Sequence, residues 1–272
     1  MTYKLAAMVI HGIGEQKPDF ADGFIAELKQ RLAENSEAVC WKAVYWADLV
    51  ESKEADLLKR LAQGGKLEWQ WLRRFVVHFL ADAVAYQRVP GKGQVDGLYE
   101  RIHARIAAKL SELREAMRSP DDTGEQDPPL LVLAHSLGGH IMSNYLWDHQ
   151  NPDPARVRAG TAFARGETLT GMITFGCNIP LFALALPEVV PIAIPRPPRS
   201  LRKPWLNLYD PDDVLGYPLV PLSDGYAALV EDRTVNVGGL LTAWNPASHN
   251  AYWTDNDATR PIAERVLQLL ES

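Results

Sequence analysis

The residues best suited to chemistry surround Ser136, in residues 133–139 (LAHSLGG). A serine hydroxyl is a weak nucleophile at neutral pH, so it must be held beside a base that can take its proton. A sharp turn from a strand into a helix does this, and the turn requires small residues on either side of the serine. Ala134 lies two positions before Ser136, and Gly138 and Gly139 follow it. The segment therefore predicts a nucleophilic serine rather than a serine in an ordinary glycine-rich turn.

This pattern resembles the Gly-x-Ser-x-Gly nucleophile elbow of the α/β-hydrolases, with Ala134 at the position of the first glycine. The apolar run over residues 130–133 predicts a buried central strand, and Ile141, Met142 and Tyr145 predict an amphipathic helix directly after the turn. An elbow requires this strand-turn-helix context. The resemblance implies an α/β fold with a mostly parallel central sheet, helices on both of its faces, and a serine hydrolase activity.

Acyl transfer also requires N–H donors that point at the oxygen that becomes negatively charged. The backbone N–H of Leu137 is one expected donor, because it follows the nucleophile at the start of a helix. Residues 9–14 (VIHGIG) resemble the His-Gly oxyanion loop of lipases and esterases, which implies that the N–H of Ile13 is the other. An ordinary glycine turn is the alternative, but it does not require His11. A dinucleotide loop is disfavoured because no third glycine completes Gly-x-Gly-x-x-Gly.

In α/β-hydrolases an acid and then a histidine follow the serine, each after a late strand. His249 is the histidine at a suitable position, so the resemblance implies that it is the general base. Three aspartates compete for the acid position, Asp210, Asp212 and Asp213. The sequence DVLGYPL, which begins at Asp213, resembles the acid-bearing turn of DDHD-type intracellular phospholipases, whereas the Asp-x-Val-x-x-x-Pro turn of class 3 lipases begins at Asp212. The prediction is Asp213, with Asp212 and Asp210 as alternatives; otherwise these residues would form a solvated acidic turn.

Two further segments, residues 174–176 (TFG) and 249–253 (HNAYW), resemble parts of class 3-like lipases. The resemblance is confined to short segments of this kind. It implies attack by Ser136 with His249 as general base, an acyl-enzyme, and hydrolysis by a water that His249 activates, with Asp213 fixing the imidazole tautomer. This chemistry requires no cofactor and no metal, and none is expected.

Alternating strands and helices predict a single α/β domain over residues 1–272, with late strands at residues 169–175, 205–209 and 233–237. Residues 48–90 have a helical pattern that is longer than a simple crossover needs. They form either a cap over the active site or a helical hairpin packed on the core.

A loop excursion over residues 179–204 combines an apolar stretch with four cations, Arg196, Arg199, Arg202 and Lys203. Such a composition suits an acyl pocket or contact with an anionic membrane surface. A proline-stiffened loop packed on the sheet is the favoured interpretation. If the excursion faces the site, the substrate is a small-molecule ester with a hydrophobic acyl group.

The composition excludes several function classes. The chain of 272 residues has a formal net charge of −6, which disfavours nucleic acid as a partner. Its two cysteines, Cys40 and Cys177, have no metal-ligand spacing and are expected as buried free thiols. The apolar run over residues 5–10 is too short for a signal peptide, and the run over residues 181–195 is interrupted by Glu188 and prolines, so a cytoplasmic protein is expected.

Other classes of function remain compatible with the same residues. One is a catalytically silent scaffold that binds a ligand or a protein, because a fold does not fix a function. Another is acyl transfer or amide hydrolysis by the same three residues. No oligomeric state is predicted.

Overall fold

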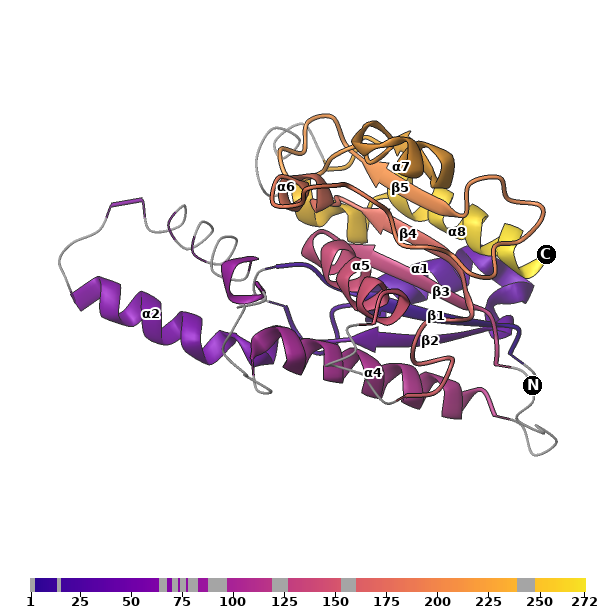
Figure 1. Cartoon of the computed structure of the whole chain (residues 1–272), viewed down its shortest axis with the longest axis horizontal. Coiled ribbons are helices and arrows are strands. Elements are labelled where there is room, and N and C mark those ends of the chain that lie inside the picture. The colour runs from indigo at the N-terminus through magenta and orange to yellow at the C-terminus, as the bar shows by residue number, and fades with distance from the viewer. Residues whose placement is uncertain are drawn as a thin grey trace.

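The computed structural model of the chain describes residues 3–13, 16–63, 68–69, 73, 77, 83–87, 97–118, 127–152, 160–238 and 248–272. A six-stranded parallel sheet in the order β2-β1-β3-β4-β5-β6 forms its centre (Figure 1). The strands are β1 Leu5–Ile10, β2 Val39–Val44, β3 Leu130–His135, β4 Leu169–Phe175, β5 Trp205–Tyr209 and β6 Val230–Thr234. This architecture confirms the predicted α/β class with a parallel sheet.

Helices connect and cover the strands. The α-helices are α1 Asp22–Leu32, α2 Glu51–Gln63, α4 Leu98–Ala116, α5 Leu137–Gln150, α6 Ile179–Ala183, α7 Asp224–Leu229 and α8 Asn256–Leu270. Short 3-10 turns are η1 Ala33–Ala38, η2 Ala47–Leu49, η4 Val220–Leu222 and η5 Ser248–Trp253.

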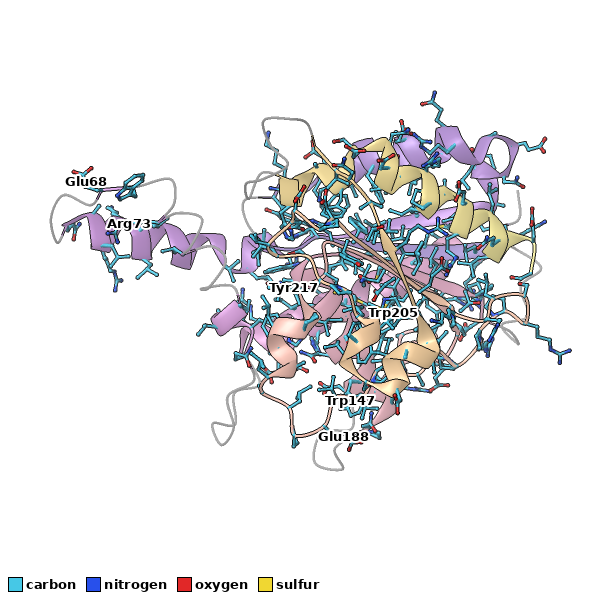
Figure 2. All side chains as sticks on the ribbon, turned by 90° about the horizontal axis from the view of Figure 1, so that it is seen from above. Glu68, Arg73, Trp147, Glu188, Trp205 and Tyr217 are labelled. Carbon is cyan, nitrogen blue, oxygen red and sulfur yellow. The ribbon has the colours of Figure 1, made fainter. Side chains whose placement is uncertain are left out.

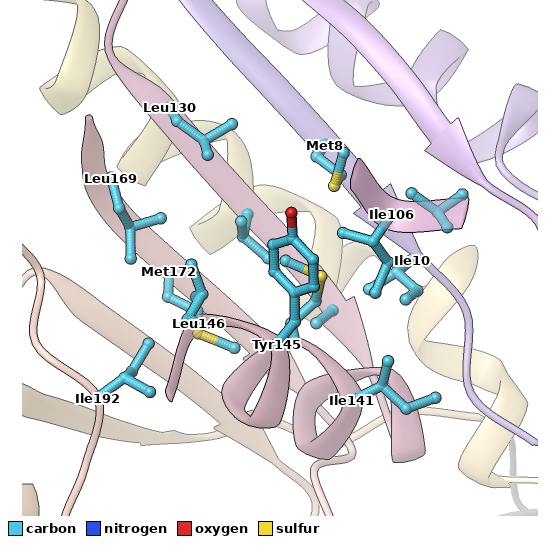
Figure 3. Packing of buried hydrophobic residues seen from close by; sticks show 14 of the residues in the cluster. Met8, Ile10, Ile106, Leu130, Ile141, Tyr145, Leu146, Leu169, Met172 and Ile192 are labelled. Carbon is cyan, nitrogen blue, oxygen red and sulfur yellow. The ribbon is translucent and has the colours of Figure 1, made fainter. Parts of the chain in front are cut away.

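Two hydrophobic clusters, one on each face of the sheet, hold the layers together. On one face, α4 and α5 pack through residues such as Ile106 and Tyr145, whose apolar surroundings Figure 3 shows. On the other face, α1 and α8 pack through residues such as Phe24 and Ile262. Every residue of β1, β3 and β4 is buried, as expected for parallel strands covered on both sides.

The strand order changes direction between β1 and β3. The chain runs from β1 outward to β2 and then returns to place β3 on the other side of β1. The helix after β1 covers one face of the sheet and the helix after β3 covers the other. In open parallel sheets, such a switch point opens a crevice at the carboxyl ends of the strands, where ligands bind. The residues that follow Ile10 and His135 are therefore expected to border such a crevice.

The last strand lies earlier in the sequence than predicted. The pattern predicts a strand over residues 233–237, whereas β6 spans Val230–Thr234 and pairs in parallel with β5. Val235 and Val237 are buried beyond the strand, and their apolar side chains account for the misplaced prediction. The apolar pattern there reflects buried side chains, which continue past the end of the strand.

Helix α2 projects away from the body of the molecule (Figure 1). Glu68 and Arg73 lie at the far end of this projection in the perpendicular view (Figure 2). The chain contacts the body again at Tyr86, whose buried hydroxyl lies 2.8 Å from Nε2 of His103. Much of the segment predicted as a cap or hairpin lies outside the described residues, so its role stays a prediction.

In the 179–204 excursion, Ile192 and Ile194 are buried in the cluster beneath α5, whereas Leu184 and Leu186 are exposed. Cys40 and Cys177 are buried free thiols, as predicted. In the described part of the chain, no helix combines the length and the apolar character needed to cross a membrane.

Candidate active site

Ser136 occupies a strained turn between β3 and α5. Its backbone has φ 53° and ψ −126°, and only two other residues without a glycine's freedom, Ala33 and Trp69, have positive φ in the described part of the chain. Such a conformation costs about 1–3 kcal/mol and persists where the surroundings enforce it, often at functional sites. Ser136 thus has the positive-φ backbone of a tight strand-to-helix turn, and its role as a nucleophile stays a prediction.

Close packing against the loop after β1 enforces this turn. A Cβ atom on Gly12 would lie 2.5 Å from Cβ of Ser136, and one on Gly138 would lie 2.6 Å from the carbonyl oxygen of His11. Both contacts are too short for any side chain. Alanine at position 134, where the Gly-x-Ser-x-Gly pattern has glycine, is accommodated, because this residue lies within β3 and its methyl group is fully buried in the sheet.

Three side chains form a continuous hydrogen-bonded chain at the carboxyl edge of the sheet. Nε2 of His249 lies 2.6 Å from Oγ of Ser136, and Nδ1 of His249 lies 2.8 Å from Oδ2 of Asp213. Ser136 follows β3, Asp213 follows β5, and His249 lies in η5. Residues that are separated by up to 113 positions in the sequence therefore meet within hydrogen-bonding distance.

The structure separates the three candidate aspartates. Asp210 accepts hydrogen bonds from the backbone N–H groups of Asp212 and Val237, and Asp212 is exposed. Neither is bonded to His249 in the described residues. Asp213 is buried and is the aspartate that contacts the imidazole.

Hydrogen bonds hold Asp213 in its ionised form. Burial alone would raise the pKa of this carboxyl, but bonds from His249, from the N–H of Leu215 and from the hydroxyl of Tyr252 outweigh that effect and lower it. The Tyr252 oxygen itself accepts the N–H of Asp210 at 2.8 Å, so its own proton points to Asp213 at 3.1 Å. An ionised Asp213 favours the tautomer with a proton on Nδ1, which leaves Nε2 of His249 free to act as a base.

His135 holds the backbone of the histidine loop. Its Nε2 donates to the carbonyl oxygen of His249 at 2.7 Å. Burial, followed by repulsion from His249, lowers the pKa of His135 well below its ordinary value, so the ring is neutral. Because Nε2 carries the proton, Nδ1 is bare, and it has no partner in the described part of the chain.

His11 holds the loop that was predicted to supply an oxyanion donor. Its Nδ1 donates to the carbonyl of Gly12 at 2.7 Å, and its Nε2 accepts the N–H of Trp46 at 3.0 Å. The indole N–H of Trp46 donates to the carbonyl of His11 at 3.0 Å, and the two rings stack with centroids 4.9 Å apart. Burial lowers the pKa of His11 to about 4, which keeps the ring neutral and able to accept.

The structure places Leu137 directly after the serine and brings the loop that contains Ile13 close to it. Leu137 is the first residue of α5, where N–H groups lack partners within the helix. Ile13 follows Gly12, at which a Cβ atom would lie 3.0 Å from Oγ of Ser136. The loop after β1 thus passes directly against the hydroxyl. Donation from either N–H to a substrate stays a prediction.

Ser136 is completely buried, and His249 and Asp213 are 4% and 3% exposed. A cavity of about 530 Å³ lies to one side of the three residues, beyond the ends of β5 and β6. It is lined by charged residues such as Asp212, Arg233 and Arg260, and not by the serine or the imidazole. The three residues are therefore shielded from bulk water.

Sequence reasoning assigned no role to Tyr252, His135 or the pairing of His11 with Trp46. Tyr252 lies three residues after His249, within the same 3-10 turn, and this spacing is the feature of the sequence that could have indicated its contact with the acid.

Among the described residues, no group of three or more His, Cys, Asp or Glu side chains could hold a metal ion. No protein-family model matches the chain, and no curated protein matches its sequence.

Proposed function

We propose that the chain is a serine hydrolase of the α/β-hydrolase superfamily that cleaves carboxylic esters of small molecules. The observation that supports this proposal most is the chain of hydrogen bonds from Ser136 through His249 to Asp213, at 2.6 Å and 2.8 Å. The strained backbone at the serine adds support, because it is the conformation that an elbow needs.

In the proposed reaction, Oγ of Ser136 attacks the ester carbonyl carbon while its proton passes to Nε2 of His249. The carbonyl oxygen becomes an oxyanion, which the N–H groups of Leu137 and Ile13 stabilise. The C–O bond to the leaving group then breaks, the alkoxide takes the proton from Nε2, and an acyl-enzyme remains. Water attacks the acyl-enzyme by the same steps in reverse, which releases the carboxylic acid and restores the serine. Asp213 stabilises the imidazolium in both halves.

Labelling by a fluorophosphonate probe tests the proposal. An activated serine attacks the phosphorus atom and displaces fluoride, whereas an ordinary hydroxyl reacts too slowly to be seen. We expect labelling of the wild type and loss of labelling in Ser136→Ala, with Ser111→Ala on the exposed face of α4 as the control that keeps it. A folded wild-type protein that takes no label would indicate a catalytically silent scaffold.

Burial of the serine favours one competing reaction, acyl transfer to an alcohol, because a water-poor site slows hydrolysis of the acyl-enzyme. Product analysis separates the two. Incubation with p-nitrophenyl esters, with and without an added alcohol, is expected to give mainly the free acid. Predominant formation of a new ester would assign the chain to acyl transfer.

A further inference from the structure

The side chain of Asn178 is buried without hydrogen-bond partners. The residue is 1% exposed, and neither Oδ1 nor Nδ2 has a partner in the part of the chain that the structure describes. Other buried residues there leave a single polar atom unpaired, whereas Asn178 leaves both a donor and an acceptor unpaired. An unpaired buried polar group destabilises the folded chain, so such a residue calls for an explanation.

The two residues before Asn178 in the chain pack against a proposed catalytic residue and the helix that follows Ser136. A Cβ atom on Gly176 would lie 3.2 Å from Cε1 of His249. A Cβ atom on Gly139, in the first turn of α5, would lie 2.9 Å from Sγ of Cys177. The two residues before Asn178 therefore pack against the general base and against the turn that follows the nucleophile.

The residues after Asn178 are held at the same place. Asn178 directly precedes α6, and Phe182 of this helix stacks on His140 of α5 with ring centroids 3.8 Å apart. The backbone just before Asn178 is fixed as well, because the carbonyl of Cys177 accepts the N–H of Tyr217. Contacts on both sides thus fix the backbone of Asn178 at the carboxyl edge of β4, between residues that pack against His249 and residues that pack against α5.

We propose that Asn178 binds substrate, and that the substrates of this site carry a hydroxyl or amide group on the acyl chain close to the ester carbonyl. A carboxamide offers two donor hydrogens and one acceptor oxygen, so it pairs best with a group that both donates and accepts. A purely apolar acyl chain leaves both ends of the amide unpaired. A site built to bond a substrate hydroxyl discriminates strongly against the analogue that lacks it. This inference rests on the proposed ester hydrolysis.

The test compares p-nitrophenyl butyrate with the p-nitrophenyl ester of the corresponding hydroxybutyrate. The measured quantity is the ratio of kcat/KM for the hydroxy ester to kcat/KM for the plain ester. Comparing this ratio between variants removes the difference in intrinsic reactivity of the two esters. We expect Asn178→Leu and Asn178→Ala each to lower the ratio about tenfold relative to the wild type. The alanine variant keeps the test decisive if the leucine variant does not fold.

Thr168→Val is the matched control. Thr168 is also buried with an unpaired polar atom, but it precedes β4 and so lies at the opposite edge of the sheet. Its removal is expected to leave the ratio at the wild-type value. An unchanged ratio in folded Asn178 variants would overturn the inference and leave the proposed function intact. A wild type that hydrolyses neither ester and takes no fluorophosphonate label would instead refute ester hydrolysis itself.

Discussion

Replacing His135 with phenylalanine tests whether the hydrogen bond to the His249 backbone positions His249, the proposed general base. Burial already keeps the His135 ring neutral by lowering its pKa, so the substitution removes no charge. The ring is 1% exposed and packs among aromatic side chains such as Phe175 and Trp253, which suits a second aromatic ring of similar size. The main change is therefore the loss of one N–H donor.

The expected loss of stability is small. The carbonyl of His249 would lose the donor that now lies 2.7 Å away, which costs about 1–3 kcal/mol. The bare Nδ1 of His135, which has no partner in the described part of the chain, would also disappear, and this gain offsets part of that cost. We expect a net loss of about 1–2 kcal/mol.

The expected loss of activity is larger. An imidazole displaced by about 1 Å from the nucleophile lowers the rate about 100-fold, because proton transfer depends on alignment. We therefore expect His135→Phe to lower kcat/KM for p-nitrophenyl esters by about 10-fold to 100-fold. His135→Gln retains an N–H donor and is expected to recover part of the activity.

His140→Phe is the control for this experiment. Burial also lowers the pKa of His140, to about 3, but its ring stacks on Phe182 and bonds to Asn144 within α5. The same substitution there is expected to leave kcat/KM unchanged. Steady-state kinetics and thermal unfolding of the three variants complete the assay. Full activity in a folded His135→Phe variant would refute a positioning role for this bond.

Three further predictions concern the same site. Asp213→Asn is expected to lower kcat about 10⁴-fold through the wrong imidazole tautomer, while Asp212→Asn on an exposed side chain leaves kcat unchanged; the reverse order in steady-state assays would reassign the acid. Gly12→Ala places a Cβ atom 2.5 Å from Cβ of Ser136. We therefore expect loss of activity and a decrease of about 1–3 kcal/mol in the free energy of unfolding. Normal turnover in this variant would contradict the close packing. Because the pKa of His11 is lowered from 6.5 to about 4, the unfolded chain binds a proton there before the folded chain does. The free energy of unfolding is therefore expected to fall by about 3 kcal/mol as the pH drops from 6.5 to about 4. Denaturant titrations of His11→Gln should show a shallower fall over this pH range. An equally steep fall in the variant would show that His11 is not responsible.

The predictions that the structure confirms came from short-range patterns in the sequence. The buried central strand was evident because β3 is apolar at nearly every position, as a parallel strand covered on both faces must be. The turn at Ser136 was evident from the small residues Ala134, Gly138 and Gly139. At Gly138 the structure shows the reason, because a Cβ atom there would lie 2.6 Å from the carbonyl oxygen of His11. The misplaced last strand shows the limit of such patterns, since buried valines look alike inside a strand and just beyond its end.

The arrangement of the acidic turn was not contained in local sequence. Asp210, Asp212 and Asp213 lie within four positions of one another; Asp212 and Asp213 each begin a motif, and Asp210 lies at the end of the predicted strand. The direction of each side chain depends on backbone angles that packing sets. At Gly216, for example, a Cβ atom would lie 2.6 Å from Oδ2 of Asp213, so the turn can close only without a side chain there. Tertiary packing therefore selected the aspartate that faces His249.

By itself, the sequence determined the class of the fold and the local geometry at Ser136, because apolar periodicity and small residues act over a few neighbouring positions. Only the tertiary structure decided which distant groups meet. His11 bonds to Trp46 across 35 positions, and His135 bonds to the His249 backbone across 114. A buried polar atom must find a partner in space, and the identity of that partner depends on how strands and loops are placed together. The unpaired amide of Asn178 is evident for the same reason, since the lack of a partner is visible only in the folded chain.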